Sequence, residues 1–129
     1  MTDNTLFAMV EALVKGKVAP TTSILTLANG ANSDIALPAT ELVRIVGPTG
    51  SFSISGFVAG TDGRKLRCYS TVSQTCTLTN NATSTAANRI LTLKGSDLAL
   101  RTTAPAFFTL SYSTADSRWI LESTNGGAV

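Results

Sequence analysis

The 129-residue sequence contains no histidine, few charged residues and few aromatic residues. Without histidine, the chain lacks the most common general base, the most common metal ligand and the usual partner of a nucleophilic serine or cysteine. Its two cysteines, Cys68 and Cys76, are too few to complete a four-ligand zinc site. We therefore expect a protein that is not an enzyme and that uses no metal or other cofactor.

Charged side chains make up only 14% of the chain, and the net charge is +2. Soluble domains average roughly 25% charged residues, so much of this surface must be small polar and apolar side chains. Apolar surface of that kind is commonly hidden between subunits, which favours an oligomer. The one local basic cluster, residues 64–67, is typical of a solvated turn, so we expect no nucleic-acid partner.

The sequence also lacks long apolar runs. None approaches the roughly 18 residues that a membrane span requires, and the N-terminus does not have the pattern of a secretory signal. We expect a protein made in the cytoplasm, with no membrane partner. In that reducing compartment Cys68 and Cys76 are expected to be buried thiols, with a disulfide as the alternative.

A helical pattern is strong only in residues 3–15. Gly16 can end this helix, and Pro20 prevents its continuation. Four apolar residues with helical spacing form one stripe: Leu6, Met9, Val10 and Leu13.

The pattern then changes to short segments with alternating polar and apolar residues, separated by turns. Strands are predicted at 23–28, 35–37, 41–46, 51–58, 65–70, 75–79, 89–93, 97–100, 107–113 and 118–122. Because no helical pattern separates them, the expected fold is all-β: an antiparallel sandwich, jelly roll or barrel with one short N-terminal helix. The expected divisions are 1–20 (helix and linker), 21–122 (β domain) and 123–129 (flexible tail).

The alternation also predicts which side chains fill the core. The residues expected to be buried are Leu25, Leu27, Val43, Ile45, Phe52, Ile54, Leu66, Leu78, Leu91, Leu93, Leu98, Leu100, Leu110 and Trp119. For Trp119, a role as a core or interface anchor outweighs that of a ligand platform. The carboxylates that could act as an acid–base pair are Asp62, Asp97, Asp116 and Glu122, but Asp62 and Asp116 stand in ordinary turn contexts.

Several segments of the second half form a recognisable set of motifs. They are Gly60-Thr61-Asp62-Gly63-Arg64, Leu78-Thr79-Asn80-Asn81, Ser84-Thr85-Ala86-Ala87-Asn88-Arg89-Ile90, Asp97-Leu98-Ala99-Leu100, Leu110-Ser111-Tyr112-Ser113 and Ser117-Arg118-Trp119. With its "GTDG" turn, "ANR" segment and closing strand that runs from Tyr to Arg-Trp, this set resembles a β-rich module of tailed-phage virion proteins, which include head-decoration, head-fibre and tail-fibre proteins. The resemblance covers about residues 42–121.

The resemblance implies a trimer that binds other proteins or glycans. Because the chain has no fibre shaft, we expect a capsid decoration or cement protein in the virion, which binds the major capsid protein or another virion protein and stabilises the head. The alternative is a receptor-binding module of a tail fibre that contacts host glycan. The candidate capsid anchor is Leu6, Met9, Val10 and Leu13, and the candidate oligomer or partner surface is Tyr112, Trp119, Arg64 and Arg89.

Overall fold

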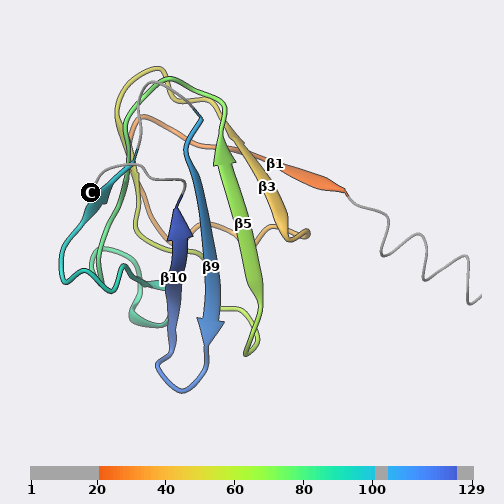
Figure 1. Ribbon diagram of the computed structural model, residues 1–129, viewed down its shortest axis with the longest axis vertical. Helices are drawn as coiled ribbons and strands as arrows, with labels where there is room; N and C mark the ends of the chain where they lie inside the picture. The colour runs from red at the N-terminus through yellow and green to blue at the C-terminus, as the bar shows by residue number, and fades with distance from the viewer. Residues whose placement is uncertain (1–20, 101–104, 125–129) are drawn as a thin grey trace, which may run out of the picture.

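The computed structural model describes residues 21–100 and 105–124 of the chain. Within these residues the chain forms ten β-strands and one short 3₁₀ helix, and the strands lie in two sheets (Figure 1). The predicted all-β class is confirmed. The predicted N-terminal helix, with the four residues of the candidate capsid anchor, lies outside the described residues.

The larger sheet has six strands and the smaller has four. The order in the larger sheet is β1 (Thr22–Thr26), β3 (Leu42–Val46), β5 (Lys65–Ser70), β9 (Phe107–Ser113), β10 (Arg118–Thr124) and β7 (Ile90–Leu91). The order in the smaller sheet is β2 (Gly30–Asn32), β4 (Phe52–Ile54), β6 (Cys76–Leu78) and β8 (Leu98–Ala99). The 3₁₀ helix η1 (Ala86–Asn88) lies between β6 and β7 in the sequence.

In the first half of the domain the chain winds back and forth between the two sheets, and each winding is one turn of a β-solenoid. The chain passes from β1 to β2, then from β3 to β4, then from β5 to β6. Strands β1, β3 and β5 pair in parallel in one sheet, and β2, β4 and β6 pair in parallel in the other. Beyond the ends of β2 and β4, a parallel bridge between Ile35 and Phe57 continues the register of these two strands. Three such turns form a short β-solenoid, in which each turn stacks on its neighbour.

The prediction of antiparallel strands throughout is wrong. In the part of the chain that the structure describes, five strand pairs are parallel and three are antiparallel. Two parallel strands need a long crossover, which is usually a helix. Here the crossover is a strand of the other sheet, so the absence of helical segments does not exclude parallel pairing.

The later strands cover the third turn of the β-solenoid. Strand β9 pairs antiparallel with β5, and β10 pairs antiparallel with β9 in a hairpin (Figure 1). In the smaller sheet β8 pairs antiparallel with β6. Strand β10 reaches Thr124, two residues beyond the predicted end of the domain, so Ser123 and Thr124 belong to the sheet and not to a tail.

The inner faces of both sheets contribute to one core. Of the residues expected to be buried, eleven are buried: Leu27, Val43, Ile45, Phe52, Ile54, Leu66, Leu78, Leu98, Leu100, Leu110 and Trp119. Leu25 and Leu91 are half-buried. The prediction for Leu93 is wrong, because its side chain is 70% exposed. At Leu93 the backbone has a φ of +62°, and Thr92 is the buried residue beside it.

Cys68 and Cys76 are buried and unbonded, which confirms the prediction of buried thiols. They lie on β5 and β6, in different sheets and not in one hairpin. Burial raises the pKa of the Cys68 thiol, and the neighbouring Cys76 raises it further. Burial also raises the pKa of Cys76, to about 12. Neither thiol is ionised near neutral pH, so both act as small apolar side chains.

Candidate functional site

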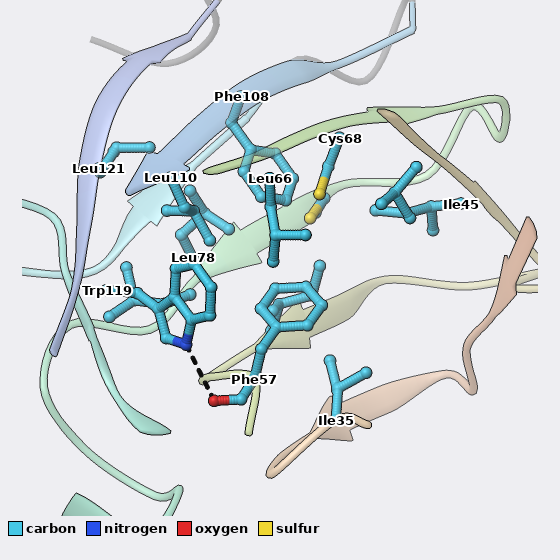
Figure 2. Close-up of a cluster of buried hydrophobic side chains, with 14 of the residues drawn as sticks. Ile35, Ile45, Phe57, Leu66, Cys68, Leu78, Phe108, Leu110, Trp119 and Leu121 are labelled. Atoms are coloured by element: carbon cyan, nitrogen blue, oxygen red, sulfur yellow. Dashed lines mark hydrogen bonds between the residues drawn. The ribbon is translucent and has the colours of Figure 1, made fainter. Parts of the chain in front are cut away.

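Four of the six motif segments of the second half meet around one side chain, Trp119. Its indole Nε1–H donates a hydrogen bond of 3.0 Å to the carbonyl oxygen of Phe57, as Figure 2 shows. Its backbone N–H donates to the carbonyl oxygen of Arg89 at 2.9 Å, and the Tyr112 hydroxyl donates to that of Ala87 at 2.9 Å. The "ANR" segment and the two closing strands are therefore joined directly.

The "GTDG" turn joins the same cluster through the β9–β10 hairpin. The backbone N–H of Gly63 donates to the carbonyl oxygen of Tyr112 at 2.8 Å, and the N–H of Tyr112 donates to that of Arg64 at 2.9 Å. The Asp62 carboxylate accepts a hydrogen bond of 2.9 Å from the backbone N–H of Thr114. At Gly63 the φ of +82° is a left-handed conformation that favours glycine.

Three aromatic rings form the centre of this arrangement, which we call the Trp119 cluster: Phe57, Tyr112 and Trp119. The Tyr112 and Trp119 ring centroids are 5.1 Å apart at an interplanar angle of 73°. The Phe57 and Trp119 centroids are 6.2 Å apart at 71°. Edge-to-face pairs of this kind add stability beyond the burial of their area.

The structure places Tyr112 and Trp119 in the core and not on an outer surface. Trp119 is 0% exposed and Tyr112 is 6% exposed within the chain alone. Sequence reasoning had grouped both with a candidate oligomer or partner surface. The alternation of β9 and β10 explains the difference, since every second side chain of each strand points inward, and these two rings do.

Arg64 and Arg89, the other residues of that candidate surface, are half-buried. The Arg64 guanidinium donates to the carbonyl oxygens of Pro38, Thr40 and Lys65. Arg89 Nε donates to the carbonyl oxygen of Ser84 at 2.8 Å. Both cations therefore bind carbonyls of their own chain and hold loops in place.

A second polar cluster, which sequence reasoning missed, joins the "ANR" segment to the first turn of the β-solenoid. We call it the Asp34 junction; it consists of Asp34, Ser55, Ser84, Thr85 and Asn88. One Asp34 carboxylate oxygen accepts hydrogen bonds from the Thr85 backbone N–H at 2.7 Å and from Asn88 Nδ2 at 2.8 Å. The backbone N–H of Asp34 donates to Ser84 Oγ at 2.9 Å, and the Ser55 and Ser84 hydroxyl groups are 2.7 Å apart.

The Asp34 junction depends on pH. The hydrogen bond from Asn88, followed by that from the Thr85 backbone, lowers the pKa of the Asp34 carboxyl. Because the folded-state pKa lies below the unfolded one, the stabilisation is present at pH values above the unfolded pKa. It is lost as the pH falls through the folded pKa, in the range below about pH 4.

We therefore expect Asp34→Asn to lower the melting temperature at pH 7 and to lower it much less at pH 2 to 3. The variant keeps an acceptor oxygen but loses the charge that the two donors favour. Thermal unfolding followed by circular dichroism across this pH range measures the difference. Asp116→Asn is the matched control, because the Asp116 carboxylate accepts its hydrogen bond from Ser113, three residues away in the same turn. An equal shift at all pH values would contradict a titrating junction.

The carboxylates considered as catalytic candidates all have structural partners. Asp62 accepts from Thr114, Asp97 accepts from the Asn80 backbone at 2.8 Å, and Asp116 accepts from Ser113. Glu122 forms an ion pair of 3.0 Å with Lys65 across the sheet, and the hydrogen bond from Lys65 lowers the pKa of Glu122. Asp116 bonds within its own turn, as expected, whereas Asp62 lies in a turn but joins it to the β9–β10 turn, 52 residues away.

Among residues 21–100 and 105–124, no group of three or more cysteine, aspartate or glutamate side chains is placed to hold a metal ion. In the same residues every buried side-chain nitrogen and oxygen has a hydrogen-bond partner. Nor do these residues include a helix long and apolar enough to cross a membrane. The chemistry of the Trp119 cluster and the Asp34 junction is thus that of satisfied internal contacts.

Comparison with known proteins adds no relative. No protein-family model matches the chain, and no curated protein matches its sequence.

Proposed function

We propose that the chain is a structural protein of a tailed-phage particle, a head-decoration or cement protein that binds the major capsid protein as a trimer. The observation that carries the proposal is the convergence of four motif segments on Trp119: the "GTDG" turn, the "ANR" segment and the two closing strands. Segments that are far apart in the sequence form one hydrogen-bonded unit, as expected if the resemblance reflects an inherited module and not a chance set of turns.

The outer face of the six-stranded sheet supports the proposed association. The register places four outward side chains in one row across β1, β3, β5 and β9: Ile24, Arg44, Tyr69 and Phe107. Ile24 is 66% exposed and Arg44 is exposed, while Tyr69 and Phe107 are half-buried. Arginine and aromatic residues are enriched in protein interfaces. This row therefore replaces Tyr112 and Trp119 as the surface that we assign to the contact between copies.

The trimer predicts a specific result in solution. Light scattering coupled to size exclusion should give three times the chain mass at micromolar concentration, and Ile24→Asp should shift the protein to monomer without changing its circular dichroism. The variant would place unpaired carboxylates in an apolar part of the contact between copies, and burying an unpaired charge is unfavourable. Lys94→Glu, an exposed change in the loop after β7, is the matched control. A wild-type monomer would contradict the trimer, though not the fold.

Electron cryo-microscopy of the phage particle tests the location. We expect three copies at threefold positions on the head surface. Density on the tail would instead support the alternative, a receptor-binding module of a tail fibre, whereas absence of the protein from purified particles would refute both.

A further inference from the structure

At the first-turn end of the β-solenoid, no further strand pairs with the edge strands in the described residues. Strand β1 pairs only with β3, and β2 pairs only with β4, so each is an edge of its sheet. At the other end, β9 and β8 cover the third turn. In Figure 1, β1 lies on the right, at the far side of the sheet from β10. Coiled repeats need a cap at each end, because an end turn otherwise exposes apolar core.

The apolar residues of the first turn are less covered than those they stack on. Leu27 and Ile35 are each 9% exposed, and Leu25 and Leu37 are half-buried. The register pairs Leu25 with Ile45 and Ile35 with Phe57, and both of these second-turn residues are 0% exposed. The core therefore becomes progressively more open toward the first turn.

Only part of this end carries its own polar cover. In the smaller sheet Asn32 stands where the next turn has Ile54. Its side chain accepts from the Ala28 backbone N–H at 3.0 Å and donates to the Ala28 and Ser53 carbonyl oxygens at 2.9 and 3.1 Å. In the larger sheet Ser23 stands where the next turn has Val43, and its backbone N–H donates to Thr40 Oγ1 at 2.9 Å. The next inward residue of β1, Leu25, is apolar and half-buried, and β1 has neither a charge nor a proline to protect its edge.

We propose that residues 1–20 of the same chain cover this end, with the apolar residues Leu6, Met9, Val10 and Leu13 placed on Leu25, Leu27, Ile35 and Leu37. This segment joins the chain at Thr21, one residue before the open strand β1. The six residues from Gly16 to Thr21 can span roughly 20 Å when extended, twice the spacing of about 10 Å between packed sheets.

The covalent connection decides between this occupant and a separate molecule. A short linker holds the segment at an effective concentration on the order of millimolar, far above a free partner at micromolar concentration. A helix that is marginal alone also gains its stability from an apolar surface of this kind. The assignment does not depend on the proposed phage function. It transfers the candidate anchor residues from the capsid to the protein's own core, which leaves the capsid contact to the β domain.

Thiol labelling of the full-length protein tests the cover. Cys68 and Cys76 are buried with raised pKa values, so a single added cysteine reports alone. The probe is Leu25→Cys, and Leu93→Cys is the control probe, because Leu93 is exposed in a distant loop. Each is combined with Met9→Asp and Val10→Asp in the apolar stripe, or with Ala8→Asp and Ala12→Asp outside it.

We expect the stripe substitutions to raise the labelling rate of Leu25→Cys about ten-fold or more and to lower the melting temperature. The Ala8 and Ala12 substitutions should change neither, and the Leu93→Cys rate should stay constant. If the stripe variant does not fold, Val10→Ser provides a milder change with the same expected direction.

Three results would overturn the proposal. Equal labelling of Leu25→Cys in all backgrounds would mean that residues 1–20 do not cover this end. If Leu25→Cys without further substitutions is labelled slowly at high protein concentration and rapidly after dilution, a second copy of the chain covers this end. Unchanged labelling and stability with loss of binding to purified phage heads would make these residues the capsid anchor.

Discussion

Replacing Gly56 with alanine should destabilise the protein more than any other single glycine substitution in the described residues. A Cβ at this position would lie 2.0 Å from the carbonyl oxygen of Asn88 and 2.7 Å from its carbonyl carbon. Both are backbone atoms, and the adjacent Phe57 N–H donates to that same oxygen at 3.1 Å, so neither segment can move without breaking the contact. We expect a loss of at least about 3 kcal/mol, beyond the usual cost of overpacking.

Chemical denaturation of Gly56→Ala beside Gly95→Ala measures this effect. Gly95 has a φ of +78° with nothing within 4 Å of its added Cβ, so its substitution tests backbone conformation alone. That cost is about 1–2 kcal/mol. A loss at Gly56 no larger than at Gly95 would show that the "ANR" segment does not pack against the β-solenoid as described.

Truncation of Trp119 should have the second-largest effect. Trp119→Ala removes a fully buried ring together with its hydrogen bond to Phe57 and its packing on Tyr112, and the expected loss is about 3–5 kcal/mol. Trp119→Phe keeps most of the ring but leaves the Phe57 carbonyl oxygen without this donor. The penalty for that unsatisfied acceptor is about 1–3 kcal/mol.

Tyr112→Phe serves as the matched control for the Trp119 series. It removes only the hydroxyl group that donates to Ala87, for an expected cost of about 1 kcal/mol. Urea unfolding followed by circular dichroism should rank the variants with Trp119→Ala least stable and Tyr112→Phe most stable. If Trp119→Ala costs no more than Tyr112→Phe, the motif segments do not depend on this ring.

The sequence predicts the strands that face the core on one side well. The predictions at 65–70 and 107–113 match β5 and β9 in both bounds. Over most of each strand, at 65–68 and 109–112, polar and apolar residues alternate, because one face is buried and the other is more exposed. The same rule places Leu66 and Leu110 in the core.

Strand β2 could not be predicted from local signals. It consists of Gly30, Ala31 and Asn32, and Asn29-Gly30 is typical of a turn. The segment is extended because it stacks in register on β4, and the Asn32 side chain bonds to neighbouring backbone. This stabilisation comes from the next turn of the β-solenoid, over twenty residues away in the sequence.

The candidate site shows the same division. The motifs are visible in the sequence, but which of their residues point inward depends on the pairing of β9 with β5. The Asp34 junction has no sequence signal, since Asp34 and Asn88 are 54 positions apart. Only the solenoid path brings the first turn next to η1.

The position of Trp119 has a consequence for the order of folding. The side chain that completes the core belongs to β10, the last strand that the structure describes, and β7 pairs with β10 in the larger sheet. Until β10 has paired with β9, the solenoid cannot bury its interior. Native contacts of such long sequence separation form slowly. We therefore expect the solenoid and the β9–β10 hairpin to become ordered together, in one slow step of refolding.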